Sequence, residues 1–236
     1  MQNYENKFFS VLGDSISTLN GCTEPNEAAF YQGMVQFEAD IFLQEDTWWG
    51  KVISHFGGFL LRNHSFSGST VHRSPWHEIE SYACSHERTS ALHREDQLPD
   101  VIMIFMGIND WGGGTKLRPE KETEREDISF FSVAYQTMLE RLRVNYPEAE
   151  LWCFTLPVST CTKKENFHFP YCYGGEHIEK YCEIIRACAS ESDARLIDLY
   201  TFCEPYDTID GFHPNANGMK TLAEGVIRAW KGEKIL

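Results

Sequence analysis

A short apolar run that stops at a glycine turn constrains the fold of this chain more than any other stretch. Residues 8–12 read FFSVL, and Gly13-Asp14-Ser15 follows them directly. A run of this length closed by glycine is typical of a buried parallel strand that leads into a loop. Ligands of open α/β sheets bind just beyond the carboxyl ends of such strands, so we expect Ser15 at the mouth of a site. Because Gly-Asp-Ser is also an ordinary turn sequence, the tripeptide alone does not identify a nucleophile.

Four further apolar runs alternate with amphipathic segments along the rest of the chain. We predict strands at residues 8–12, 59–66, 101–106, 151–156 and 195–199, and helices at residues 47–56, 128–146, 176–192 and 215–230. This alternation indicates a parallel sheet with helices on both faces, which is the α/β class. No internal repeat or break in composition divides the chain, so we predict a single domain over residues 1–236. Long loop excursions are expected near residues 19–47, 71–99 and 157–175.

The composition of this 236-residue chain excludes several classes of partner. Its formal net charge of −14 argues against nucleic-acid phosphate, and more weakly against anionic membrane surfaces. No stretch approaches the roughly 18 apolar residues of a membrane span, and no export signal is visible, so the expected location is the cytoplasm. The eight cysteines and nine histidines lack metal-ligand spacing, so we expect free thiols, no metal and no other cofactor.

A second chemical motif, DGFHP at residues 210–214, lies far downstream of Ser15. Two residues between Asp210 and His213 allow a tight turn to bring the carboxylate against the imidazole. The carboxylate can then fix the tautomer of the ring and stabilise its cation. The other ring nitrogen is free to activate a hydroxyl, and a serine hydroxyl is a weak nucleophile without such a base. Ser15, His213 and Asp210 therefore supply the residue types of a catalytic triad.

Acyl transfer also needs hydrogen-bond donors for the charge that develops on the carbonyl oxygen. The backbone N–H groups of Ser15 and Gly68 and the side-chain amide of Asn109 each follow a predicted strand and are candidates for this oxyanion hole. Trp111 lies two residues after Asn109, and we expect it to form a wall of the substrate pocket. Arg88 lies in the excursion at residues 71–99, where it is either a contact for a polar substrate group or an ordinary surface arginine.

Four blocks of the sequence resemble the signature of the SGNH hydrolases, also called GDSL-type esterases and lipases. They are GDSIS (13–17), SFSGST (65–70), GIND (107–110) and DGFHP (210–214), and they span nearly the whole chain. The resemblance implies Ser15 as nucleophile with Asp210 and His213, and Ser15, Gly68 and Asn109 in the oxyanion hole. It also implies a flavodoxin-like, three-layer α/β/α sandwich with a five-stranded parallel sheet. The chain lacks the G-x-S-x-G sequence of the α/β-hydrolases.

The sequence therefore predicts a serine esterase that hydrolyses carboxylic esters through an acyl-enzyme. Its expected partner is a small-molecule ester with a short acyl group, such as acetyl on a carbohydrate. Acyl-CoA thioesterase and lysophospholipase-type lipase activities are alternatives, as is a catalytically silent ligand-binding domain of the same fold. The natural ester, the acyl length and the oligomeric state stay open at this stage.

Overall fold

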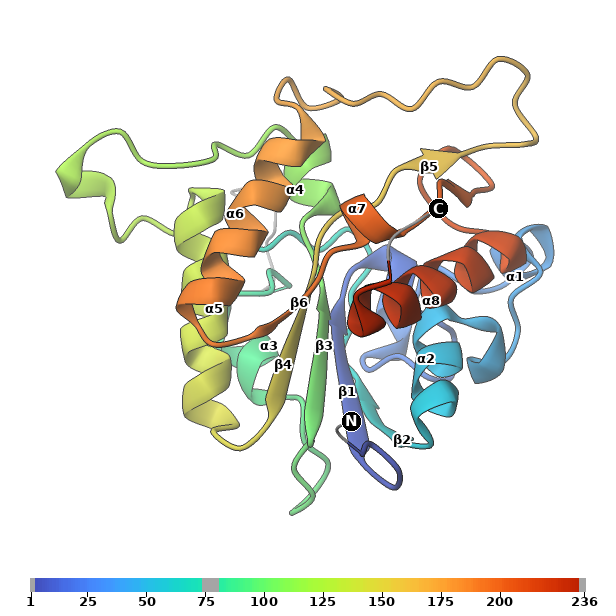
Figure 1. The fold of residues 1–236 in the computed structure, drawn as a ribbon, viewed down its shortest axis with the longest axis horizontal. Coiled ribbons are helices and arrows are strands. Elements are labelled where there is room, and N and C mark those ends of the chain that lie inside the picture. Colours follow the sequence, from blue (N-terminus) through green and yellow to red (C-terminus); the bar gives the residue numbers. More distant parts are fainter. Residues whose placement is uncertain (1–2, 74–80, 234–236) are drawn as a thin grey trace.

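A five-stranded parallel sheet lies at the centre of the computed structural model, which describes residues 3–73 and 81–233 (Figure 1). The strand order is β2-β1-β3-β4-β6, and every neighbouring pair is parallel. The strands are β1 (Phe8–Gly13), β2 (Phe59–Asn63), β3 (Val101–Phe105), β4 (Glu150–Phe154) and β6 (Arg195–Ile197). The predicted α/β class and its five-stranded parallel sheet are confirmed.

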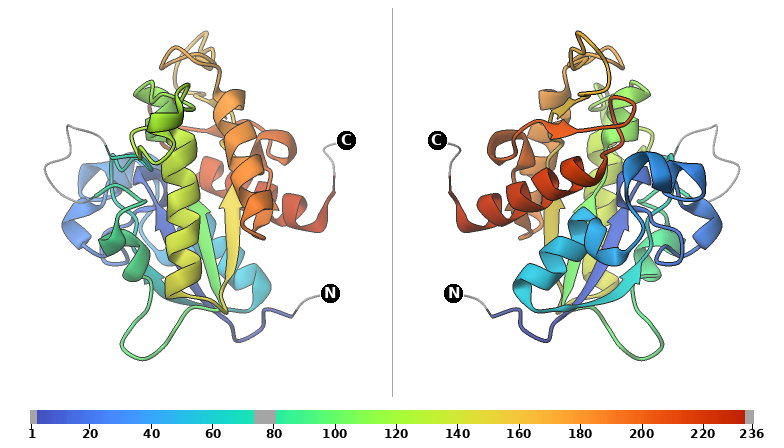
Figure 2. Two further views of the ribbon diagram at one scale, coloured as in Figure 1. Left: turned by 90° about the vertical axis from the view of Figure 1, so that its left-hand side faces the viewer. Right: turned by 90° about the vertical axis from the view of Figure 1, so that its right-hand side faces the viewer.

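Helices cover both faces of this sheet and complete the three layers (Figures 1 and 2). On one face, α2 (Trp48–Phe56) packs against α8 (Ala216–Lys231). On the opposite face, α5 (Phe131–Asn145) packs against both α3 (His86–Ser90) and α6 (Ile178–Glu191). The short helix α1 (Met34–Ala39) lies at the outer margin of the α8 side (Figure 1).

The core is built around β3, in which every residue is buried. A central parallel strand is covered on both faces, which explains why its sequence is an unbroken apolar run. Trp48 of α2 is fully buried against the sheet, and its ring meets Phe105 and Phe154 edge-on at centroid distances of 5.5 and 5.4 Å. Such edge-to-face contacts fix the helix over the strands more firmly than burial alone.

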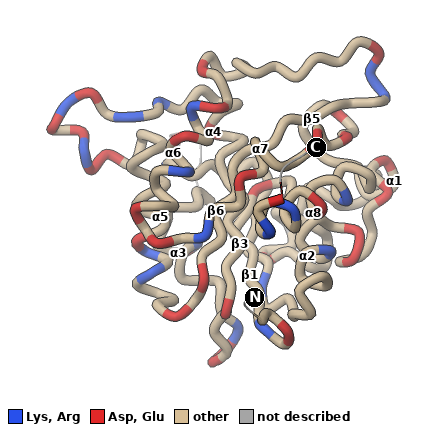
Figure 3. Tube along the Cα trace, in the orientation of Figure 1, with Lys and Arg blue, Asp and Glu red and all other residues tan. Residues whose placement is uncertain are grey.

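The charged residues are dispersed over the outer helices and loops, whereas the central strands carry few of them (Figure 3). The acidic surplus of the chain therefore lies mainly in contact with water, where charged side chains are well solvated. Among the described residues, no helix is both long and apolar enough to cross a lipid bilayer.

Most predicted helices and strands lie where expected, but β2 is shorter than the expected 59–66. Its regular pairing ends at Asn63, whose Oδ1 accepts a hydrogen bond from Ser65 N at 3.1 Å and turns the chain. The sequence analysis did not predict α4 (Ile108–Gly112), which follows β3 directly. It also missed α7 (Leu199–Phe202) and the two-stranded parallel sheet of β5 (Ser159–Thr160) and β7 (Tyr206–Asp207).

Two of the three expected excursions contain short elements, whereas the excursion at residues 157–175 is open loop apart from β5 near its start. The segment at residues 19–47 holds α1 together with two 3-10 turns, η2 (Asn26–Ala28) and η3 (Gln44–Asp46). The segment at residues 71–99 contains α3, and its residues 74–80 lie outside the described part of the chain. Two further 3-10 turns are η1 (Ser15–Ser17) and η4 (Glu122–Glu124).

The first turn of α8 provides a test of this packing at Gly218. A Cβ at Gly218 would lie 1.9 Å from the carbonyl oxygen of Asp207, which the pairing of β5 with β7 holds in place. We expect Gly218→Ala to lower the free energy of unfolding by about 1–3 kcal/mol, although alanine favours helix more than glycine does. Urea unfolding would measure the change. The exposed Asn217→Ala is the matched control and should stay within about 0.5 kcal/mol of wild type. A Gly218→Ala protein more stable than wild type would contradict the packing described.

Candidate active site

The ends of three strands and the loop that precedes α8 bring the candidate residues to the same edge of the sheet. Ser15 follows β1, Gly68 follows β2, and Asn109 lies in α4 directly after β3. The fourth segment, residues 208–214, precedes α8 and carries Asp210 and His213. Parallel strands share the edge at which they end, so residues far apart in the chain meet there.

Ser15, His213 and Asp210 form a continuous row of hydrogen bonds. His213 Nδ1 lies 2.6 Å from Asp210 Oδ2, and His213 Nε2 lies 2.9 Å from Ser15 Oγ. When Nδ1 carries the proton toward the carboxylate, Nε2 is left as an acceptor for the serine hydroxyl. Ser15 is 198 residues away from His213 in the chain, so this contact is a product of the fold.

The loop around Asp210 is held by hydrogen bonds from its backbone N–H groups to the side chains of Asp210 and Thr208. Asp210 Oδ1 accepts from the backbone N–H groups of Phe212 at 2.9 Å and His213 at 2.8 Å. Thr208 Oγ1 accepts from Gly211 N at 3.0 Å, and Gly211 takes a φ of +113°, which favours glycine. Partial burial acts to raise the pKa of Asp210, but the hydrogen bonds from His213 and Phe212 outweigh it and hold that pKa well below its usual range. Asp210 is therefore a carboxylate at neutral pH.

The imidazole of His213 has a second neighbour that the sequence analysis did not identify. The ring of Phe30 is stacked on it, with centroids 3.6 Å apart and planes inclined by 12°. Phe30 N also donates to Thr18 Oγ1 at 2.8 Å, and Thr18 Oγ1 donates to the carbonyl of Ser15 at 2.8 Å. Phe30 thus fixes the histidine ring from one side and is tied to the serine turn. It lies in the excursion at residues 19–47, where no periodic pattern distinguishes it from its neighbours.

The turn that presents Ser15 depends on a buried carboxyl group. Asp14 is 2% exposed and caps η1, because its Oδ1 accepts from Ile16 N at 3.0 Å. Burial raises the pKa of Asp14 to about 7; the nearby Asp110 adds to this, whereas the Ile16 hydrogen bond and Arg88 oppose it. The candidate nucleophile therefore follows directly on a carboxyl group that changes charge near neutral pH.

The side chain of Asn109 is oriented by the segment that follows β2. Its Nδ2 donates one hydrogen to the carbonyl of Ser69 at 2.8 Å, and a primary amide has a second hydrogen to offer. Asn109 lines the same pocket as Ser15. Gly68, next to Ser69, is exposed with a φ of +77° and lies outside the described residues that line this pocket.

Arg88 is buried beneath the site, and it is neither at the surface nor in the pocket. Its side chain is 2% exposed, and the guanidinium donates to the carbonyls of Gly13 at 3.0 Å and His64 at 2.8 Å. It also donates to Ser69 Oγ at 2.9 Å and to the carbonyl of Ser81. Burial lowers the pKa of Arg88 to about 10, with the nearby Asp14 opposing this shift. A substrate contact is therefore not supported: Arg88 joins the end of β1, the end of β2 and the glycine turn beneath the site.

A second carboxylate–imidazole pair connects the glycine turn to α4. Asp110 is fully buried and accepts from Val71 N at 2.8 Å, His72 N at 3.2 Å and His72 Nδ1 at 2.7 Å. Thr115 Oγ1 lies 3.1 Å from the same ring nitrogen. This pair lies in the loop framework, and no local sequence motif surrounds His72 to indicate it.

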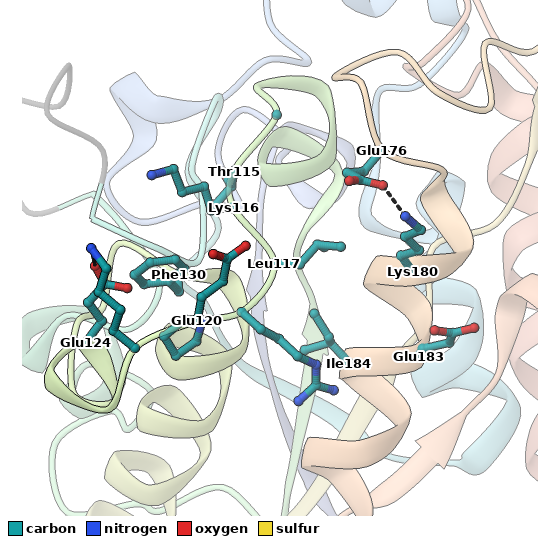
Figure 4. A pocket seen from close by; sticks show the side chains of 14 residues that line it. Thr115, Lys116, Leu117, Glu120, Glu124, Phe130, Glu176, Lys180, Glu183 and Ile184 are labelled. Atoms are coloured by element: carbon teal, nitrogen blue, oxygen red, sulfur yellow. Dashed lines mark hydrogen bonds and ion pairs between the residues drawn. The ribbon is translucent and has the colours of Figure 1, made fainter.

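A pocket of about 250 Å³ opens at Ser15 and His213. Trp111, Tyr173 and Phe212 form its aromatic walls, so Trp111 lines the same pocket as Ser15 and His213. A larger open hollow of about 790 Å³ lies next to it, between residues 114–124 and α6 (Figure 4). Its lining mixes acidic and basic side chains, among them the Lys180–Glu176 ion pair, and includes none of the three residues of the row. The smaller pocket is therefore the one that contains the candidate residues Ser15 and His213.

The described residues offer no place for a metal-dependent site. No group of three or more His, Cys, Asp or Glu side chains among them is arranged to hold a metal ion. All eight cysteines are free thiols, and burial raises the pKa of the thiols of Cys84, Cys153, Cys182 and Cys203 to about 12. Such thiols remain protonated at neutral pH and are poor nucleophiles.

The sequence and the fold are both similar to those of known proteins. The sequence matches the GDSL-like lipase/acylhydrolase family over residues 7–162, which include Ser15, Gly68 and Asn109. The fold is similar to two proteins described as GDSL-like lipases, one from Bacteroides ovatus and one from Bacteroides uniformis. The first has 24% identity, a TM-score of 0.70 and coverage of 97% of this chain and 99% of that one. The second has 25% identity, a TM-score of 0.70 and coverage of 96% of each chain.

A more distant fold similarity is to a carbohydrate acetylesterase from Sinorhizobium meliloti. It has 17% identity, a TM-score of 0.60 and coverage of 96% of this chain and 98% of that one. No curated protein gives a significant match to the sequence. Asp210 and His213 lie beyond the range of the family match, so their relation to Ser15 comes from the structure.

The buried carboxyl group of Asp14 predicts a pH dependence of stability. Its pKa is about 7 in the folded chain and about 4 when unfolded, so the folded state binds the extra proton between these values. Stability should therefore fall as pH rises from about 4 to 7, by up to about 1.4 kcal/mol per pH unit from this group. Asp14→Asn keeps an acceptor for Ile16 N and should remove this part of the slope. Urea unfolding at pH 4.5, 5.5, 6.5 and 7.5 measures it, with the exposed Asp127→Asn as control. An unchanged slope in Asp14→Asn would show that Asp14 does not titrate in this range.

Proposed function

The chain belongs to the GDSL-like lipase/acylhydrolase family of ester hydrolases, and on that premise we propose that Ser15, His213 and Asp210 cleave a carboxylic ester through an acyl-enzyme. The observation that carries the proposal is the hydrogen-bonded row, with 2.9 Å between Ser15 Oγ and His213 Nε2 and 2.6 Å between His213 Nδ1 and Asp210 Oδ2. A nucleophile, its base and an orienting acid in this order are the parts that serine acyl transfer requires.

In the first half of the reaction, Ser15 Oγ attacks the ester carbonyl while His213 Nε2 takes the hydroxyl proton. Asp210 holds the proton on Nδ1 and stabilises the imidazolium that forms. The tetrahedral oxyanion accepts hydrogen bonds from the free hydrogen of Asn109 Nδ2 and from the backbone N–H of Ser15, two residues that line the pocket; Gly68, the third donor proposed from the sequence, does not line it. A single donor of this kind is worth about 3 kcal/mol of barrier. Collapse of this intermediate breaks the C–O bond, and His213 returns the proton to the departing alcohol.

In the second half, water replaces the alcohol. His213 takes a proton from the water as its oxygen attacks the acyl carbon, and the same donors hold the second oxyanion. The bond to Ser15 then breaks, the serine recovers its proton from His213, and the free acid leaves. Because Asp210 stays ionised, His213 alone among the three changes charge during the cycle.

The proposed substrates are esters of short acyl groups, such as acetyl on a carbohydrate or another small molecule. A pocket of about 250 Å³ with walls of Trp111, Tyr173 and Phe212 is small for a fatty acyl chain. Apart from His213, the described residues that line it include no ionisable cation that could pair with the phosphates of acyl-CoA. The fold similarity to a carbohydrate acetylesterase is in keeping with this substrate class.

Loss of the Ser15 hydroxyl is the direct test. We expect Ser15→Ala to lower kcat/KM for p-nitrophenyl acetate by about 10³-fold or more, because the remaining groups cannot form the acyl-enzyme. The variant should also fail to react with a fluorophosphonate probe, as measured by intact-protein mass spectrometry. Ser67→Ala, which removes a nearby hydroxyl outside the row, is the control and should keep both properties. Full activity in Ser15→Ala would refute the proposal. A folded wild-type protein that the probe does not label would favour the silent binding domain.

A further inference from the structure

A long segment between β5 and α6, residues 161–177, passes across the edge of the sheet where the pocket opens (Figure 1). We call it the strap. Building on the proposed esterase function, we propose that the strap is the outer wall of the substrate pocket and that Tyr173 on it limits the length of the acyl group. The strap has almost no regular secondary structure, so its position depends on contacts at its two ends.

The first part of the strap is fastened to the loop that carries Asp210 and His213. Thr162 N and Thr162 Oγ1 donate to the two carboxylate oxygens of Asp207 at 2.9 and 2.8 Å. Lys164 Nζ donates to the backbone carbonyl of Asp210. The ring of Phe167 packs so closely on Gly211 that a Cβ there would lie 2.9 Å from it.

The last part of the strap is fastened to α4, which carries Asn109. Trp111 Nε1 donates to the carbonyls of Tyr171 at 3.3 Å and Glu176 at 3.2 Å. The backbone of Gly174 lies directly on α4, because a Cβ there would be 1.8 Å from Trp111 O and 2.6 Å from Gly114 N. The strap therefore bridges the two loops that supply the proposed base and the proposed oxyanion donor.

Tyr173 lies between these two fastenings and lines the pocket. Its ring centroid is 5.3 Å from that of Phe212 and 6.0 Å from that of Trp111, and those two rings are 6.2 Å apart, so Tyr173 completes a cluster of three rings on this side of the pocket. Tyr173 is 61% exposed, which means that its ring separates the pocket from solvent instead of belonging to the core. Removing the ring would extend the pocket outward with little effect on folding.

The chemistry of the wall indicates the acyl group as its occupant. Ser15, His213 and Asn109 are assigned to the reaction, and the indole N–H of Trp111 is already bonded to the strap. The rest of the wall is mainly aromatic and aliphatic, which suits a hydrocarbon chain better than the hydroxyl groups of a sugar. The polar alcohol part would then lie toward the open mouth of the pocket.

The experiment compares acyl selectivity in three variants. Kinetics would be measured on p-nitrophenyl acetate, butyrate and hexanoate, which differ only in acyl length. We expect Tyr173→Ala to raise the ratio of kcat/KM for hexanoate to kcat/KM for acetate by about tenfold or more. Accommodating one additional methylene in an apolar pocket changes kcat/KM by about this factor. Tyr173→Phe keeps the ring and should keep the wild-type ratio. Tyr171→Ala is the matched control, because Tyr171 is on the same strap but stacks on His177 at 5.3 Å, away from the pocket.

A second series with a fixed acetyl group and alcohols of increasing size distinguishes the two sides of the ester. An unchanged acyl ratio in Tyr173→Ala would overturn the inference, and so would a change confined to the alcohol series. An equal change in Tyr171→Ala would also overturn it, because the effect would then belong to the strap as a whole. The proposed function is tested separately by Ser15→Ala on acetate, so an active, Ser15-dependent enzyme with an unchanged acyl ratio refutes only the role of Tyr173.

Discussion

The contact between Ser15 and His213 depends on two turns that are built independently of each other. The serine turn is shaped by the Asp14 cap, whose Oδ1 accepts from Ile16 N. The histidine turn is shaped by Asp210, whose one carboxylate oxygen accepts two backbone N–H groups while the other meets the imidazole. The parallel sheet brings these rigid turns to the same edge. The 2.9 Å contact then follows from backbone geometry, with little freedom left to the side chains.

The framework beneath the site contains charges that are expensive to bury. Arg88, Asp14 and Asp110 are all nearly inaccessible to water, and a buried ion is tolerated only when it is paired or fully hydrogen-bonded. Arg88 meets this condition in part: its two terminal nitrogens donate to Gly13, His64, Ser69 and Ser81, whereas its buried Nε has no partner among the described residues. Asp110 meets it through two backbone N–H groups and His72. Asp14 meets it least well, which is why its pKa is raised and why the region should respond to pH.

Local patterns were sufficient to predict the sheet, the main helices and the four segments of the candidate site. A buried parallel strand is visible as an apolar run. Asp210, three residues before His213, can reach the imidazole through a tight turn. Both signals are contained in a few consecutive residues. Arg88 and Phe30 could not be found in this way. Each acts through residues far away in the chain, Arg88 on Gly13 and Ser69 and Phe30 on His213. An arginine in a polar excursion looks the same in sequence whether it is buried or exposed.

The structure separates the groups proposed for chemistry from those proposed for selectivity. The hydrogen-bonded row and its donors lie on short turns at strand and helix ends, where backbone hydrogen bonds hold them. Tyr173 lies on a long strap that touches the same turns through its ends, yet no hydrogen bond of the row passes through it. A side chain on such a segment can change size without moving the reacting groups, because loops tolerate substitution better than the elements they connect. If both proposals hold, the fold can keep one mechanism while the strap determines which ester it serves.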